Sequence, residues 1–215
     1  SWLMYSNDLL NYLPQSGNFE KFELQFWTID EIEVDDVTPE QQRNLTTWYA
    51  EHAVDFIERH ADNPFFLYVP HNMPHVPLFC SNKFEGKSGE GLYADVMMEI
   101  DWSVGQIMDV LERKGVANDT VFVFTSDNGP WVSYGNHAGY TPYREAKGTG
   151  FDGGTRSACV IKYPNGIPAG QQSHQAFCSV DLLPTFAKLA GAELPDYKID
   201  GIDVYDIVTW QPNAT

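Results

Sequence analysis

An acidic and an amide side chain stand next to each other where a short apolar segment ends. Asp127 and Asn128 follow the apolar residues 121–124, which are rich in β-branched and aromatic side chains. Such a segment predicts a strand that is buried on both faces, as in a parallel sheet. Carboxylate and carboxamide oxygens suit a hard cation such as Ca²⁺ or Mg²⁺. Asn128-Gly129 is also a hairpin-turn signal, so the pair alone leaves a metal site and a simple turn open.

Two histidines occupy a second polar segment, which also follows an apolar stretch, residues 65–69. His71 and His75 are four residues apart, a spacing that aligns metal ligands only on a helix. Pro74 and Pro77 forbid a helix here. A loop histidine at a strand end could instead transfer a proton or bind an anion, or it could be held by the local backbone.

A lysine lies in a long loop that is rich in glycine and aromatic residues. This loop covers residues 131–150 and contains Lys147. Loops of such length in a compact domain are usually functional or disordered. Taken by itself, Lys147 fits an ordinary surface charge as well as a binding role.

Three helices are predicted around these segments. The first helix should begin at residues 38–41, which form a capping box with proline at the first helical position. It should stop before Pro64. A long amphipathic helix is expected over residues 90–115, ending at a glycine. A third helix is expected over 180–190, with Gly191 as its stop signal.

The order of these segments predicts a parallel sheet. Residues 65–69 and 121–124 are joined by a long connection that contains a helix, which is typical of a βαβ unit. Residues 157–162 are a third candidate strand, and residues 199–210 are expected to form a short strand or a loop. The fold class is therefore α/β, with a partly parallel sheet flanked by helices. In such a sheet His75 would emerge at the same edge as Asp127, where ligands bind.

The charge balance excludes two classes of partner. The chain has 13 basic and 30 acidic residues among 215, a net charge of −17. Nucleic acids and polybasic membrane contacts both need clustered positive charge, so neither is expected. No segment is long and apolar enough to span a membrane.

Cysteines and glycosylation signals bear on the compartment. The three cysteines show no CxxC spacing and an odd count, which fits one disulfide or three buried thiols; they are Cys80, Cys159 and Cys178. Three sequons would permit glycosylation of a secreted or lysosomal protein; they begin at Asn44, Asn118 and Asn213.

Three longer blocks resemble signature blocks of the type I sulfatases, which belong to the alkaline-phosphatase-like superfamily. These blocks are residues 64–77, 124–130 and 147–156. Shorter matches follow the family's order, at residues 5–8, 91–93, 181–185 and 200–203. The blocks also resemble those of enzymes of the arylsulfatase A and N-acetylgalactosamine-6-sulfatase type. The resemblance implies that residues 5–203 are the C-terminal portion of a sulfatase catalytic domain, and that 204–215 begin a truncated C-terminal region.

The resemblance also assigns roles to particular residues. Asp127 and Asn128 match the family's pair of calcium ligands, so Ca²⁺ is expected rather than Mg²⁺. Lys147 matches the lysine that contacts the sulfate group and the leaving oxygen, and His75 matches the histidine that binds sulfate or protonates the leaving group. These roles agree with the need to stabilise anionic oxygens and to supply a proton as an S–O bond breaks. Asp152 stands where the family commonly has Glu.

One expected part of the family's site is absent from the sequence. The family's nucleophile is a formylglycine made from the first residue of a C/S-x-P/A-x-R motif, and no such motif occurs here. The Asp-Asp calcium ligands near the family's N-terminus are missing too. Because the sequence also begins at Ser1 rather than Met, we expect an incomplete, inactive second half of the catalytic domain. The formylglycine is then expected in the missing N-terminal half.

The expected function is that of a sulfuric ester hydrolase acting on a sulfated carbohydrate or an aryl sulfate. Two alternatives remain open: a phosphodiesterase or phosphonate hydrolase of the same superfamily, and a non-catalytic remnant that binds sulfated glycans. The resemblance implies a sulfate-ester partner, a secreted, lysosomal or periplasmic location, and a full-length protein that could form homo-oligomers.

Overall fold

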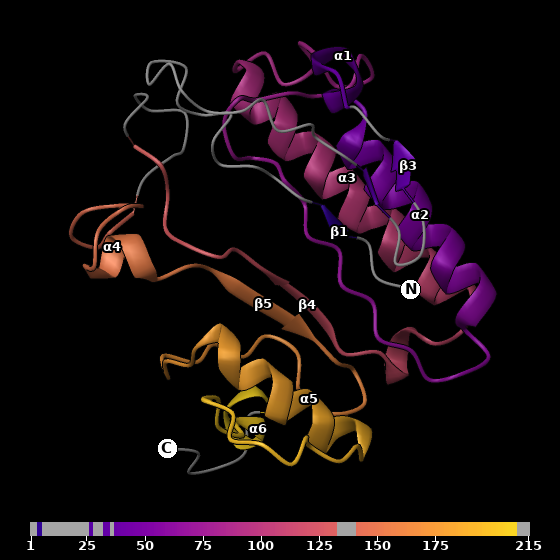
Figure 1. The fold of residues 1–215 in the computed structure, drawn as a ribbon, viewed down its shortest axis with the longest axis vertical. Coiled ribbons are helices and arrows are strands. Elements are labelled where there is room, and N and C mark those ends of the chain that lie inside the picture. Colours follow the sequence, from indigo (N-terminus) through magenta and orange to yellow (C-terminus); the bar gives the residue numbers. More distant parts are fainter. Residues whose placement is uncertain (1–3, 6–25, 28–31, 35–36, 133–140, 210–215) are drawn as a thin grey trace. The chain divides into compact units, whose positions relative to one another are not determined.

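The computed structural model describes residues 4–5, 26–27, 32–34, 37–132 and 141–209. The chain divides into two compact units, Ser1–Val116 and Ala117–Thr215. Figure 1 labels their helices and most of their strands.

The first unit begins with three short antiparallel strands. They are β1 (Met4–Tyr5), β2 (Phe26–Trp27) and β3 (Ile32–Val34), in the spatial order β1-β2-β3. Met4 pairs with Trp27, and Phe26 pairs with Val34.

The predicted capping box opens the helical part of this unit. In α1 (Pro39–Gln42) the Gln41 backbone N–H donates to the Thr38 hydroxyl at 3.3 Å, and the Thr38 N–H donates to the Gln41 side chain at 2.9 Å. A short break follows, and α2 (Leu45–His60) then runs until it ends ahead of Pro64. The predicted start and stop are both confirmed.

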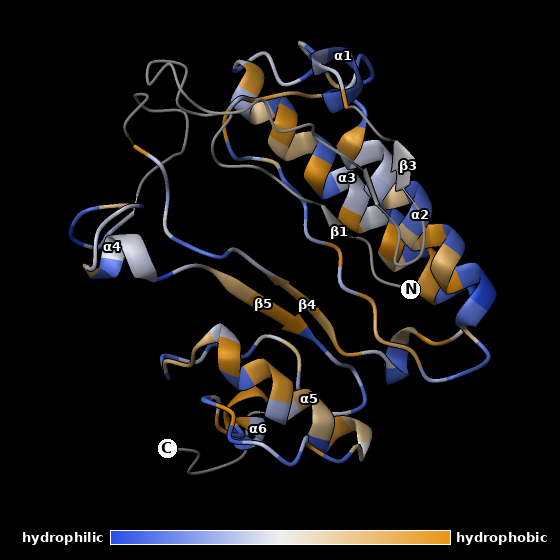
Figure 2. Ribbon diagram, viewed as in Figure 1, coloured by the Kyte–Doolittle hydropathy of each residue, from blue (hydrophilic) through white to orange (hydrophobic). Residues whose placement is uncertain are grey.

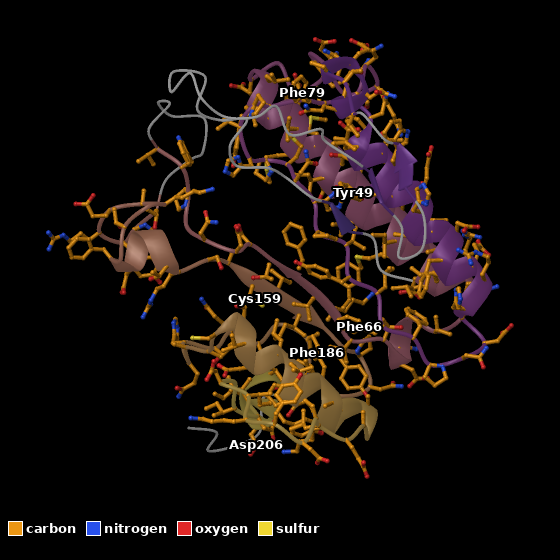
Figure 3. The ribbon with its side chains drawn as sticks, in the orientation of Figure 1. Tyr49, Phe66, Phe79, Cys159, Phe186 and Asp206 are labelled. Atoms are coloured by element: carbon orange, nitrogen blue, oxygen red, sulfur yellow. The ribbon has the colours of Figure 1, made fainter. Side chains whose placement is uncertain are left out.

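Helices α2 and α3 (Leu92–Arg113) pack against each other and bury their apolar faces. Figure 2 shows hydrophobic residues recurring along both helices. The fully buried side chains include Tyr49 and Ile57 of α2 and Val96 and Val110 of α3; Tyr49 is labelled in Figure 3. Gly115 follows α3 with a φ of 73°, the left-handed conformation expected after a helix end.

The predicted strand at residues 65–69 is wrong. These residues have no regular secondary structure, and Phe66 (labelled in Figure 3) and Tyr68 are 51% and 54% exposed. A strand exists only where a neighbour accepts and donates backbone hydrogen bonds. No strand of the described residues pairs with this segment, and all strands described pair antiparallel, so the partly parallel sheet is not confirmed.

The second unit contains the other two predicted strands. After the 3₁₀ turn Ala117–Asp119, β4 (Phe122–Thr125) pairs antiparallel with β5 (Cys159–Lys162). The register joins Phe122 to Lys162 and Thr125 to Cys159. Asn128-Gly129 therefore does not form a tight hairpin, because the partner of β4 begins only at Cys159.

Short helices complete the second unit. They are α4 (Asp152–Thr155), the 3₁₀ turn Ser179–Asp181, α5 (Leu182–Ala190) and α6 (Tyr205–Val208). Helix α5, which carries Phe186 (Figure 3), confirms the third predicted helix, and Gly191 ends it with a φ of 65°. The expectation of a strand or loop over 199–210 is wrong for α6 and right for 199–204, which have no regular structure.

Two side chains of the 181–185 block hold the 200–203 block in place. The Asp181 carboxylate accepts hydrogen bonds from the backbone N–H groups of Cys178 (2.7 Å) and Ile202 (2.9 Å). The buried Thr185 hydroxyl accepts one from the Val204 N–H at 3.0 Å. These two blocks therefore have a structural role in this chain.

All three cysteines are free thiols, so no disulfide forms, and only Cys80 is buried. The alternative of three buried thiols is thus wrong for Cys159 (labelled in Figure 3) and Cys178. The sequon residues Asn44 and Asn118 are exposed, while Asn213 lies outside the described residues. Among the described helices, none is both long and apolar enough to cross a membrane.

Candidate active-site loops

The predicted metal ligands lie directly after β4. Asp127 is exposed and Asn128 is half-buried. From the described part of the chain, Asp127 receives a long hydrogen bond, 3.5 Å, from the Ser126 hydroxyl. The Ser126 carbonyl is itself fixed by the Ser157 hydroxyl at 2.6 Å, which ties the start of this loop to the residues before β5. The Asp127 carboxylate thus keeps most of its acceptor capacity.

Three glycines bring the loops of this site into direct backbone contact. The Gly129 N–H donates to the Gly154 carbonyl at 3.0 Å, and the Gly153 N–H donates to the Arg144 carbonyl at 2.8 Å. A Cβ on Gly129 would lie 1.8 Å from the Gly153 oxygen, and one on Gly153 would lie 2.0 Å from the Glu145 oxygen. Any larger residue would therefore push the loops apart.

Lys147 is positioned by this contact. Its backbone N–H donates to the Pro130 carbonyl at 3.0 Å, so the lysine is attached to the segment that carries Asp127. Its Nζ lies 5.1 Å from the centroid of the Trp131 ring. Partial burial lowers the pKa of Lys147, and the negative charge of Asp127 partly offsets this.

A divalent cation needs more ligands than this pair provides. Ca²⁺ takes six to eight oxygen ligands, including several carboxylates. Asp127 and Asn128 supply oxygens of the right chemistry, but the described residues contain no group of three or more His, Cys, Asp or Glu side chains suited to a metal ion. The pair therefore fits part of a calcium site, with further ligands required.

His75 belongs to the first unit, whereas Asp127, Asn128 and Lys147 belong to the second. Its ring is half-buried, and Nδ1 lies 2.8 Å from the Val76 carbonyl oxygen. If Nδ1 carries the proton in this contact, Nε2 is left as the acceptor nitrogen. Because residues 65–69 form no strand, the expected common sheet edge of His75 and Asp127 is wrong, while the assignment of His75 to the site stays a prediction.

Sequence reasoning noted the half-buried His71 beside His75 but did not predict its partners. His71 Nε2 lies 3.3 Å from the Ser103 hydroxyl, and its ring packs edge-on against Tyr49. Burial lowers the pKa of His71 to about 4, so the ring is neutral at physiological pH. Its one signal in the sequence was its place directly after an apolar segment.

Two arginine–aromatic pairs beside Lys147 were also missed. Arg144 stacks on Phe151, and Arg156 stacks on Tyr143. The sequence offered only the proximity of cationic and aromatic residues within one loop, which does not say which ring meets which cation.

Comparison with known protein families identifies the family of this chain. The sulfatase family model matches residues 4–192, which is most of the chain. The chain belongs to the sulfatase family. Human steryl-sulfatase is 40% identical over 177 residues, which is 79% of this chain and 30% of that protein. Mouse N-acetylgalactosamine-6-sulfatase is 42% identical over 168 residues, 76% of this chain and 32% of that protein. This sulfatase chain thus spans about a third of the length of these curated relatives.

Solved structures agree with this assignment. The PsFucS1 sulfatase of a Pseudoalteromonas species matches with a TM-score of 0.75 at 29% identity, covering 84% of this chain and 38% of that one. A phosphonate monoester hydrolase of Silicibacter pomeroyi matches with a TM-score of 0.61 at 17% identity, over 79% of this chain and 42% of that one. At 17% identity, the similarity to the phosphonate monoester hydrolase is evidence for the fold alone. The sulfatase chain therefore has the alkaline-phosphatase-like fold.

Proposed function

We propose that the full-length protein hydrolyses a sulfate ester, and that this chain supplies the metal-side half of its active site. The observation that carries the proposal is the glycine contact of three loops, beside which the Lys147 backbone is hydrogen-bonded to Pro130, three residues after Asp127. A cation and an open carboxylate held together by backbone contacts suit a site that binds both a metal ion and an anion.

In this proposal Asp127 and Asn128 hold one side of a calcium ion, which would neutralise negative charge on the sulfate oxygens. The Lys147 ammonium donates hydrogen bonds to the sulfate group and to the leaving oxygen. Burial keeps the pKa of Lys147 below its ordinary value, which brings the ammonium closer to proton transfer at neutral pH. His75, as an imidazolium with a proton on both ring nitrogens, donates from Nε2 to the sulfate or gives that proton to the leaving oxygen. The formylglycine nucleophile is supplied from outside these 215 residues.

The proposed substrate class agrees only in part with the substrates that the relatives' names give. Their names point to steryl sulfates and to N-acetylgalactosamine 6-sulfate. We place the activity on a sulfated carbohydrate or an aryl sulfate, in a secreted, lysosomal or periplasmic compartment. Asn44 and Asn118 are exposed and would be open to glycosylation there.

The test is hydrolysis by the full-length protein of p-nitrophenyl sulfate and, in parallel, of bis(p-nitrophenyl) phosphate. We expect the sulfate ester to be the better substrate. Lys147→Ala should lower kcat/KM for it by about 10² to 10³-fold. Lys87→Ala, an exposed lysine of the other unit, is the matched control and should have no effect. Preference for the phosphodiester, or full activity of Lys147→Ala, would overturn the proposal.

A further inference from the structure

The loop that carries Lys147 also presents two arginines, each stacked on an aromatic ring. The guanidinium carbon of Arg144 lies 3.9 Å from the Phe151 centroid, and that of Arg156 lies 4.9 Å from the Tyr143 centroid. All four residues are exposed, and Phe151 and Tyr143 are each 43% exposed. Stacking of this kind restricts the orientation of a guanidinium group before any ligand arrives.

The two arginines differ in how their charge is balanced. Arg156 forms an ion pair with Asp152, with Nε 3.4 Å from the carboxylate. A hydrogen bond with Tyr143 and the charge of Asp152 raise the pKa of Arg156. Arg144 forms no ion pair with any of the described residues, although the chain as a whole carries a net charge of −17. Of the two arginines, Arg144 is therefore the one whose charge is open to an anion.

Backbone hydrogen bonds anchor the loop that carries both Arg144 and Lys147. The Arg144 carbonyl accepts the Gly153 N–H at 2.8 Å, and the Lys147 N–H is bound to the Pro130 carbonyl at 3.0 Å. Three residues span at most about 11 Å of chain, so the Cα atoms of Arg144 and Lys147 lie within that distance of each other. Phe151 lies between Lys147 and Gly153 in sequence, so its ring belongs to the same fixed loop.

We propose that Arg144, stacked on Phe151, binds a second anionic group of the substrate whose scissile sulfate contacts Lys147. This inference rests on the proposed sulfatase function and narrows its substrate class to carbohydrates that carry at least two anionic groups. Arginine suits this role because its planar fork donates two parallel hydrogen bonds to a tetrahedral or planar oxyanion. An aryl or steryl monosulfate leaves Arg144 without a partner.

The simplest competing explanation is that Arg144 only covers the ring of Phe151. Both explanations predict some disturbance when Arg144 is replaced. They differ in selectivity, because a purely structural arginine would affect all ligands of the site equally, whereas a subsite would affect only ligands with the second anionic group.

The experiment measures inhibition of p-nitrophenyl sulfate hydrolysis by the full-length protein. The probes are one disaccharide in two forms, monosulfated and disulfated, and the readout is the ratio of their inhibition constants. In the wild type we expect the disulfated form to bind about tenfold more tightly. Arg144→Gln should bring the ratio close to one, and Arg144→Lys should restore part of it because the charge returns without the planar fork.

Two further variants separate the explanations. Phe151→Leu keeps the charge and removes the ring, so it should lower the ratio by a smaller factor than Arg144→Gln. Arg59→Gln, an exposed arginine of α2 that pairs with Asp55, is the matched control and should keep the wild-type ratio. An unchanged ratio in Arg144→Gln, or equal weakening of both probes, would overturn the subsite while leaving the sulfatase function intact. Absence of any sulfate-ester hydrolysis in the wild type would overturn both.

Discussion

Two regions of this chain use carboxylates in opposite ways. In the first unit, Asp95 and Glu99 of α3 are buried, and both oxygens of each accept hydrogen bonds. Asp95 accepts the backbone N–H groups of Gly86 and Ser88, each at 2.8 Å. Glu99 accepts the Thr47 hydroxyl at 2.9 Å and the Ser81 N–H at 2.8 Å.

At the end of β4 the arrangement is reversed. Asp127 is exposed, and from the described residues it receives a 3.5 Å contact with the Ser126 hydroxyl. A carboxylate whose lone pairs are all occupied fixes the local fold, whereas one with open lone pairs can bind a cation. Asp95 and Glu99 therefore hold residues 81–91 onto α3, whereas Asp127 has oxygens that are open to a ligand.

The largest expected effect tests the open carboxylate. Asp127→Ala in the full-length protein should lower sulfate-ester turnover by about 10³-fold or more, because a metal ligand is lost. Removing bound divalent metal with a chelator should reproduce this loss, and added Ca²⁺ should reverse it. Because Asp127 is exposed, the free energy of unfolding of the metal-free protein should change by less than about 0.5 kcal/mol. Full activity of the variant would contradict the assignment of Asp127 as a ligand.

Replacing a carboxylate whose two oxygens both accept hydrogen bonds should instead lower the stability of the fold. Glu99→Ala removes the acceptor of the buried Ser81 N–H and of the Thr47 hydroxyl, which should lower the free energy of unfolding by about 3 kcal/mol. Urea denaturation of the full-length protein measures this. Glu99→Gln keeps one acceptor oxygen and should lose less. A loss as small as that of Asp127→Ala would remove the distinction between the two regions.

The glycine contact beside Asp127 predicts a smaller loss of activity. Gly153→Ala would place a Cβ 2.0 Å from the Glu145 carbonyl oxygen, so the Lys147 loop must move. We expect kcat/KM to fall by about 100-fold through misplacement of the lysine. A Cβ on Gly150, in the same loop, would meet no atom within 4 Å, so Gly150→Ala is the control. Equal effects of the two substitutions would contradict the role of the contact.

The smallest effect concerns pH and the half-buried His71. Its folded pKa of about 4 lies below the ordinary value of 6.5, so the unfolded chain binds a proton more readily than the folded one. Stability is therefore fully present above pH 6.5 and falls as the pH drops toward 4, by about 2 kcal/mol at pH 5. Replacing His71 with Phe should remove this part of the pH dependence, as measured by urea unfolding at pH 8 and pH 5. Identical slopes in variant and wild type would show that other groups dominate.

Local signals in the sequence were sufficient for the helices. The capping box at Thr38, the apolar spacing of α2 and α3, and the glycines 115 and 191 each act through neighbours within a few residues. The sequence also predicted β4 and β5, because short segments rich in apolar and β-branched residues favour strands. The segment 65–69 has the same composition and forms no strand, since a strand depends on a partner that composition cannot supply.

The site divides in the same way. The sequence by itself supplied the candidates, because the resemblance to sulfatase signature blocks assigned roles to Asp127, Asn128, His75 and Lys147, and these assignments stay predictions. The tertiary structure decided which acids are open, which cations are stacked and which glycines touch. Asp95 and Asp127 are identical side chains in the sequence, and only the folded backbone shows that one has its oxygens filled by N–H groups while the other does not. Hydrogen bonding and burial arise between segments distant along the chain, so they exist only once the loops have met.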